Sequence, residues 1–217
     1  MEESDLKEIY RILLEEFGPQ KWWPAETRFE VIVGAFLTQQ TKWSNVERAI
    51  GNLRQAGLLE PYDLAKADII ELEEMIRCCG FYRQKAARLR NAAQFLIEND
   101  MYELFNLPID QLRKILLSLN GVGNETADSI LLYAADKPKF VIDAYTTRIM
   151  SCIGVEGNYG KLQKLFESAL PQDVTMFKEY HALIVEYGKS YCGKKRCEEC
   201  ILIKGHRKGT MHGKEQV

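Results

Sequence analysis

The sequence predicts an all-α protein. Apolar residues recur with helical spacing nearly throughout, several segments carry helix start and stop signals, and no segment shows strand alternation with hairpin turns. The chain has 217 residues, of which 46% are hydrophobic and 28% are charged. This composition supports one large domain or two small ones and excludes disorder as the main state.

The helices can be placed in order from these signals. The first is expected over residues 6–17, where Gly18 and Pro19 stop it. Capping-box pairs, three residues apart, mark the start of the next three helices: Thr27 with Glu30, Ser44 with Glu47, and Asp68 with Glu71. A long basic helix is expected over 82–98, and further helices near 109–118, 124–134, 143–153, 159–169 and 174–190.

The net charge of −2 does not itself indicate a nucleic-acid binder, but basic residues are concentrated in two segments. Residues 77–91 hold five Arg or Lys and no acid, and residues 192–217 hold seven against three Glu. Such segments are either a surface for a polyanion or two solvated helix faces. The acidic start lacks a secretion signal, and the longest apolar run, Val31–Leu37, is too short to span a bilayer. Six cysteines without a secretion signal indicate a reducing, cytoplasmic location.

Two helices flank a glycine-rich turn at residues 112–131. Gly121 and Gly123 allow the backbone to approach a ligand, and the second helix begins with free N–H groups that favour an anion such as a DNA phosphate. A plain helical hairpin, with glycine serving geometry alone, is the alternative.

The motifs LTQQT (37–41), GFYRQKA (80–86), LNGVGNETAD (119–128) and VIDAYTTR (141–148), followed by late cysteines, occur in this order. In this the chain resembles the helix-hairpin-helix DNA glycosylases of the endonuclease III superfamily. The resemblance implies a two-lobed fold with a cleft. Residues 23–136 would form a six-helix barrel with the hairpin, and residues 1–22 with 137–217 would form a second helical lobe carrying the cysteine loop.

The resemblance also implies catalytic residues. Asp143 occupies the place of an aspartate that stabilises positive charge on the sugar and orients a water, and it can also serve as a helix N-cap. Glu125 occupies the place of the lysine with which bifunctional members form an imine. A carboxylate cannot form an imine, so a monofunctional glycosylase without AP-lyase activity is expected. Ala35 stands where the adenine-mismatch branch needs a glutamate, which argues against that route.

Residues that would bind DNA follow from the same motifs. Gln39, Gln40, Phe81 and Tyr82 match loops that fill the hole left by a flipped nucleotide or wedge the duplex. Ordinary packing is the alternative for Phe81 and Tyr82. At the hairpin, the predicted DNA-binding residues are Gly121, Gly123 and Asn124.

The three tryptophans, Trp22, Trp23 and Trp43, lie around WWP and LTQQTKW, a combination that resembles the 3-methyladenine DNA glycosylase branch. A methylated purine carries positive charge, which an electron-rich ring face attracts. Such a base is a good leaving group and needs no strong general acid. The alternative is that these tryptophans are core residues.

The late cysteines have the spacing C-x4-C-x2-C, whereas the iron–sulfur loop of the superfamily is usually C-x6-C-x2-C-x5-C. Cys192, Cys197 and Cys200 with His206 could hold a [4Fe–4S] cluster, which the resemblance favours, or zinc, or no metal. The remaining cysteines, Cys78, Cys79 and Cys152, are expected to be buried thiols.

Together these features predict a monomeric DNA repair glycosylase that acts on double-stranded DNA with a damaged base and does not bind a membrane. Its expected substrate is an alkylated purine such as 3-methyladenine. Two alternatives remain: an endonuclease III-like glycosylase for oxidised pyrimidines or mismatches, and a DNA-structure-binding protein without catalysis.

Overall fold

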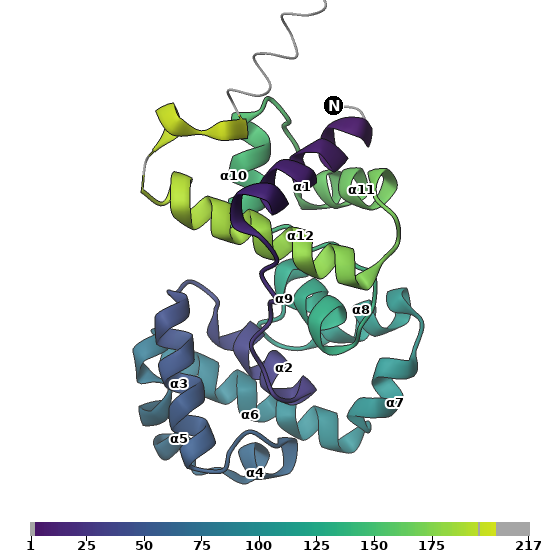
Figure 1. Ribbon diagram of the computed structural model, residues 1–217. Coiled ribbons are helices and arrows are strands. Elements are labelled where there is room, and N and C mark those ends of the chain that lie inside the picture. The colour runs from purple at the N-terminus through teal and green to yellow at the C-terminus, as the bar shows by residue number, and fades with distance from the viewer. Residues whose placement is uncertain (1–2, 195, 203–217) are drawn as a thin grey trace, which may run out of the picture. The chain divides into compact units, whose positions relative to one another are not determined.

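The computed structural model describes residues 3–194 and 196–202, and all regular secondary structure in this part is helical, which confirms the all-α prediction (Figure 1). Within the described residues, no helix is long and apolar enough to cross a membrane. The helices are α1 (Glu3–Phe17), α2 (Arg28–Leu37), α3 (Trp43–Gln55), α4 (Pro61–Lys66), α5 (Ile69–Met75), α6 (Tyr82–Glu98), α7 (Met101–Asn106), α8 (Ile109–Ser118), α9 (Asn124–Ser129), α10 (Ala144–Cys152), α11 (Tyr159–Ala169) and α12 (Val174–Tyr187), with the short turns η1 (Arg77–Cys79), η2 (Ile130–Ala134), η3 (Gly188–Cys192) and η4 (Cys197–Glu199).

The chain folds into two compact units. The central unit is continuous and comprises Trp23–Lys139. The terminal unit combines Met1–Trp22 with the chain from Phe140 onward. The chain therefore passes between the units twice, after Trp22 and after Lys139.

The core of the central unit is built around α2. Every residue from Phe29 to Leu37 is buried, and α2 packs against α3, α6, α9 and η2. The helix begins as its capping pair predicts, because Thr27 Oγ1 accepts a hydrogen bond of 3.1 Å from the Glu30 backbone N–H. The buried Glu30 carboxylate accepts a hydrogen bond of 2.7 Å from Arg54 on α3, which joins the two helices.

The core of the terminal unit is aromatic. Phe140 stacks on Phe166 with ring centroids 4.2 Å apart, and Phe177 and Tyr180 meet Phe140 edge-on. The Tyr180 hydroxyl donates a hydrogen bond of 2.8 Å to the Leu6 carbonyl, which joins α1 to α12 across most of the sequence.

Several boundaries differ from the expected ones. The short helices α4 and α7 were not expected, because six residues span fewer than two helical turns and are too few to show a repeating apolar pattern. The expected helix 124–134 becomes α9 followed by the π-turn η2, and the expected helix 174–190 ends at Tyr187 and continues as the π-turn η3. Gly188, where η3 begins, lies so close to the Tyr145 ring that a Cβ atom there would overlap it.

Candidate functional site

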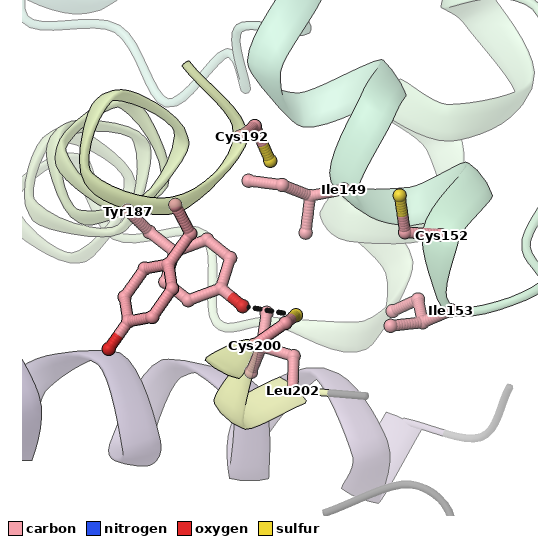
Figure 2. Close-up of a pocket in the computed structure, with 8 residues that line it drawn as sticks. Ile149, Cys152, Ile153, Tyr187, Cys192, Cys200 and Leu202 are labelled. Atoms are coloured by element: carbon pink, nitrogen blue, oxygen red, sulfur yellow. Dashed lines mark hydrogen bonds between the residues drawn. The ribbon is translucent and has the colours of Figure 1, made fainter. Parts of the chain in front are cut away.

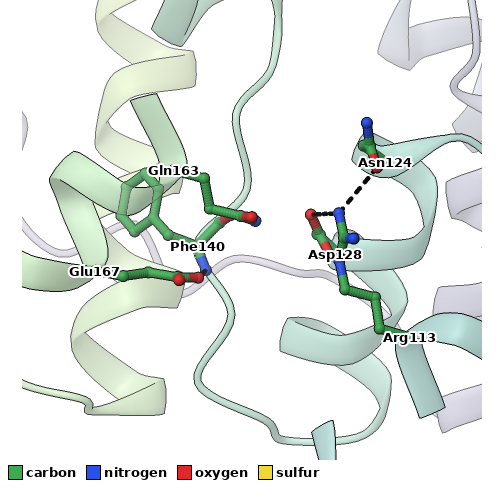
Figure 3. A network of polar contacts seen from close by, with 6 residues as sticks. All are labelled: Arg113, Asn124, Asp128, Phe140, Gln163 and Glu167. Atoms are coloured by element: carbon green, nitrogen blue, oxygen red, sulfur yellow. Dashed lines mark hydrogen bonds and ion pairs between the residues drawn. The ribbon is translucent and has the colours of Figure 1, made fainter. Parts of the chain in front are cut away.

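The hairpin of the central unit is held by an ion pair whose carboxylate is fully buried (Figure 3). On α8, Arg113 donates through Nε to Asp128 Oδ1 at 2.7 Å and through Nη2 to Asp128 Oδ2 at 3.0 Å. A third bond of 2.9 Å goes from Arg113 Nη2 to Asn124 Oδ1. Asp128 is 0% exposed, so this bidentate pair joins the two hairpin helices from within. The Asn124 side chain, predicted to bind DNA, thus has a structural partner in its own hairpin.

Gly121 is required by the turn itself. Its φ of 82° lies in the left-handed region, and a Cβ atom would overlap the Arg88 side chain of α6. Gly123 is exposed in extended conformation at the N-cap of α9, with nothing within 4 Å of a Cβ built there. Glu125 follows in the first turn of α9 and is exposed.

The loop after α2 is tied to the hairpin by Gln39. Its Nε2 donates to the Gly121 carbonyl at 3.0 Å and to Thr126 Oγ1 at 2.9 Å. Gln40, the next residue, is exposed and has a φ of 54°, which a non-glycine residue rarely adopts. Of the two predicted glutamines, Gln39 therefore has a structural partner and Gln40 is presented to solvent.

The loop before α6 presents Phe81 in the same way. Phe81 is 63% exposed, with a φ of 47°, at the N-cap of α6. Phe81 is therefore not packed in the core, which was the alternative for this residue. Tyr82 is half-buried, with the guanidinium groups of Arg77 and Arg83 5.4 and 5.7 Å from its ring centroid.

Sequence reasoning missed Lys85, which is 2% exposed. Its Nζ donates hydrogen bonds to the carbonyls of Leu37 at 2.9 Å, Gln39 at 2.7 Å and Cys79 at 2.8 Å. Burial, the largest influence, lowers the pKa of Lys85. The signal was present, because Lys85 precedes Leu89 by four residues and so falls on the apolar stripe of α6.

An aromatic cluster of the central unit contains two of the three tryptophans. The Trp23 ring lies 5.4 Å from Trp43 at an interplanar angle of 86°, and 5.3 Å from Tyr133 at 58°. Gly34 lies beneath Trp23, since a Cβ atom there would be 2.9 Å from Trp23 Cζ2. Both tryptophans are half-buried. Trp22 belongs to the terminal unit, where the Lys189 ammonium lies 5.5 Å from its ring centroid, so the structure does not place it in this cluster.

Asp143 is the N-cap of α10, as one of its two predicted roles requires. Its Oδ1 accepts hydrogen bonds of 2.7 Å from both the backbone N–H and the hydroxyl of Thr146. The carboxylate is half-buried and also acts electrostatically on His181 of α12. Burial lowers the pKa of His181, and the negative charge of Asp143 opposes that shift.

The backbone that leads to Asp143 is fixed by α11 (Figure 3). The Phe140 N–H donates to Glu167 Oε1 at 3.0 Å, and Gln163 Nε2 donates to the Phe140 carbonyl at 2.7 Å. The backbone N–H and carbonyl of Phe140, three residues before Asp143, are thus both held by α11.

The cysteine loop borders a small apolar pocket of the terminal unit (Figure 2). Cys192 and Cys200 line it together with Cys152, and the Tyr187 hydroxyl lies 2.6 Å from Cys200 Sγ. Cys152 is exposed, so its expected burial is wrong, because it lies at the C-terminal end of α10. Cys79 is buried as expected, whereas Cys78 is only half-buried.

The predicted metal set lies only partly within the described residues. The side chain of Cys197 and all of His206 fall outside them. Among the side chains that are described, no group of three or more His, Cys, Asp or Glu is placed to hold a metal ion. Two of the four predicted ligands, Cys192 and Cys200, are soft thiols at one apolar pocket, and this donor chemistry suits an iron–sulfur cluster.

Comparisons with known proteins show the family to which the chain belongs. The profile of the HhH-GPD superfamily base excision DNA repair protein matches residues 33–172. A Methanocaldococcus jannaschii protein, MJ1434, whose own assignment as a DNA repair glycosylase is provisional, is 52% identical over 200 residues, which cover 88% of this chain and 91% of that protein.

Solved structures are similar as well. The Helicobacter pylori 3-methyladenine DNA glycosylase MagIII, bound to 1,N6-ethenoadenine, has a TM-score of 0.74 and 29% identity, covering 88% of this chain and 98% of that one. An endonuclease III–DNA complex has a TM-score of 0.80 at 20% identity, covering 97% and 99%, and shows the shared fold. The chain therefore belongs to the HhH-GPD superfamily of base excision DNA repair proteins, as a DNA repair glycosylase.

Proposed function

We propose that this glycosylase is monofunctional and excises alkylated purines, above all 3-methyladenine, from double-stranded DNA. The observation that carries the proposal is the cluster of Trp23, Trp43 and Tyr133. Half-buried indole rings offer a π-face to a cationic base, which is the feature that distinguishes 3-methyladenine from normal adenine. The similarity to MagIII, a 3-methyladenine DNA glycosylase, supports the same substrate class.

The arrangement of the cluster suits selection by stacking. Trp23 packs against Gly34, lies nearly perpendicular to Trp43 and is tilted against Tyr133. A ring fixed in this way loses little conformational entropy when a base stacks on it. A flipped base with a positive charge would gain both stacking and cation–π attraction, whereas a neutral base would gain stacking alone.

The chemistry requires one carboxylate, and Asp143 is the proposed one. As the bond between C1′ and the purine nitrogen breaks, positive charge develops on the sugar, and an anionic carboxylate stabilises it. Water then adds to C1′ and loses its proton, which yields a free base and an abasic sugar. Thr146 occupies Oδ1 of Asp143, so we assign the interaction with sugar or water to Oδ2.

Strand cleavage is not part of the proposed reaction. A lyase needs an amine that attacks C1′ and forms an imine. Glu125, exposed in the first turn of α9, supplies a carboxylate at the position where bifunctional relatives carry lysine. The product is therefore an intact strand with an abasic site.

Gln40 and Phe81 are the proposed DNA-inserting residues, because both are exposed on loops of the central unit. Gly121 and Gly123 would let the hairpin backbone approach phosphates. Gln39, through its hydrogen bond to Thr126, and Asn124, through its hydrogen bond from Arg113, would help to fix the loop after α2 and the hairpin.

For the cysteine loop, Cys192, Cys197, Cys200 and His206 would hold a [4Fe–4S] cluster, with zinc or no metal as the alternatives. The cluster would supply structural cross-linking of a basic loop rather than redox catalysis. Metal analysis of the purified protein, with its visible absorption spectrum, distinguishes iron–sulfur, zinc and metal-free protein.

The test of the main proposal is base release from methylated duplex DNA by the wild type and by Asp143→Asn. Asparagine is as good an N-cap as aspartate, so the bond to the Thr146 N–H can persist while the charge is removed. Release of 3-methyladenine by the wild type alone, with nicks only after alkali, is the expected result. Equal release by both proteins would contradict the role of Asp143.

The remaining outcomes point to the other candidates. Nicking without alkali would show that an amine elsewhere in the chain forms an imine. Release of oxidised pyrimidines or mismatched bases in place of alkylated purines would replace the proposed substrate. Tight binding to abasic DNA without release of any base would indicate a DNA-structure-binding protein.

A further inference from the structure

The buried ammonium of Lys85 connects two loops that are far apart in sequence. Two of its three acceptors, the Leu37 and Gln39 carbonyls, lie at the end of α2 and in the loop that follows. The third, the Cys79 carbonyl, lies at the end of η1, just before the loop that leads into α6. A lysine ammonium has three donors, so all of them are used on backbone.

Each of these loops presents one of the two proposed inserting residues. Gln40 directly follows the carbonyl of Gln39, and Phe81 lies two residues beyond that of Cys79. Both have positive φ, 54° and 47°, although neither is glycine. Such backbone is strained for residues with a side chain and persists only where the surrounding structure holds it.

The geometry points to Lys85 as a positioning residue that holds Gln40 and Phe81 at a fixed separation, so that both side chains enter the duplex together at the damaged base. This inference rests on the proposed function, in which the two residues insert into DNA. Lys85 itself is buried and would not touch the DNA.

The chemistry of the clamp favours lysine over other residues. An unpaired ammonium would not persist in the interior, and charge-assisted bonds to three carbonyls make its burial tolerable. The fixed loops would also bind DNA without a further loss of conformational entropy. Arginine carries the same charge, but its planar fork cannot direct three donors from one atom.

The first arm of the test uses the free protein. Lys85→Met keeps the length of the side chain and removes all three donors, and Leu89→Ala, one turn further along α6 and equally buried, controls for lost stability. Hydrogen exchange of residues 38–41 and 79–82, relative to α3, should rise about tenfold in Lys85→Met, because each of the three carbonyls loses its charge-assisted hydrogen bond. In Leu89→Ala the same ratio should stay unchanged.

The second arm measures insertion without chemistry, on a duplex with an abasic site opposite 2-aminopurine. Wild-type protein should raise the fluorescence by unstacking the probe, and Lys85→Met should lose most of that rise while its affinity for undamaged duplex stays within about twofold. Added to a Gln40→Ala/Phe81→Ala background, Lys85→Met should change the fluorescence little. Lys85→Arg, which keeps the charge, provides a second variant if the methionine protein does not fold, and it should also lose insertion.

Two results would overturn the inference: exchange of both loops unchanged in Lys85→Met and Lys85→Arg, or an equal loss of insertion in the background that lacks both inserting side chains. Failure of the proposed function gives a different pattern. A wild type that releases no base but shows Lys85-dependent insertion would disprove the excision proposal and support the clamp.

Discussion

The ion pair between Arg113 and Asp128 makes the stability of the hairpin directly testable. Replacing Arg113 by Met keeps the bulk of the side chain and removes two bonds to a carboxylate that is 0% exposed, together with the bond to Asn124. Asp128 would then be left in the interior without its cation. Breaking a buried pair in this way costs about 3–5 kcal/mol.

That loss is large beside the whole stability of a protein, about 5–15 kcal/mol. At about 2–4 °C for each kcal/mol in a chain of this size, the melting temperature should fall by about 10 °C. Urea unfolding followed by circular dichroism measures the free energy directly, and an unchanged m-value would show that the variant unfolds from the same folded state.

The double variant Arg113→Met/Asp128→Leu is the matched control. Removing both charges leaves no buried carboxylate without its cation, so the double variant should recover at least about 2 kcal/mol relative to Arg113→Met. A loss of unfolding free energy below about 1 kcal/mol in Arg113→Met would refute the reasoning, since a solvent-exposed ion pair contributes no more than this. Failure of the double variant to recover would show that packing, rather than charge, explains the loss.

Three further predictions concern other parts of the molecule. Gly34→Ala should displace Trp23, because the new Cβ would lie 2.9 Å from Cζ2, and it should change tryptophan fluorescence and slow base release in a protein that still folds. Phe81→Gly should relieve a positive φ, so it should unfold at equal or higher urea concentration while losing insertion into DNA; a clear loss of stability would contradict this. The lowered pKa of His181 means that the unfolded chain binds the extra proton first, so its contribution to stability is present above about pH 6.5 and is lost as pH falls toward the folded pKa. Urea unfolding at several pH values should show that His181→Gln has a shallower decline in stability below this pH than the wild type.

Local sequence signals located most helices, whereas tertiary packing determined the features that these signals do not indicate. The helices 82–98, 109–118 and 159–169 have the expected bounds, because capping and breaking residues flank them in the sequence. The π-helical segments at 130–134 and 188–192 were not predictable, since a π-helix that continues an α-helix has no distinct apolar pattern in the sequence. The expected N-cap role of Asp143 is observed, because an aspartate before a helix satisfies backbone donors within four residues.

The candidate site shows the same limit. Predicted residues such as Gln39 and Asn124 are present at the expected positions, and their amides make contacts that the motifs did not indicate, with Thr126 and Arg113 respectively. A sequence motif specifies the residue types, but it does not show which neighbouring residue each side chain contacts. Lys85 was hidden for a related reason: in a basic segment a lysine looks like a surface residue, and only its place on the apolar stripe of α6 indicates burial.

The division of the chain into a continuous and an interrupted unit has a kinetic consequence. The central unit, 23–139, can form from contacts within one stretch, whereas the terminal unit must join α1 to α11 and α12 across that whole stretch. Bringing distant ends together costs loop entropy, and this cost is smaller once the intervening chain is already compact. We therefore expect the central unit, with its hairpin and aromatic cluster, to fold first, and the unit that carries Asp143 to be completed afterwards.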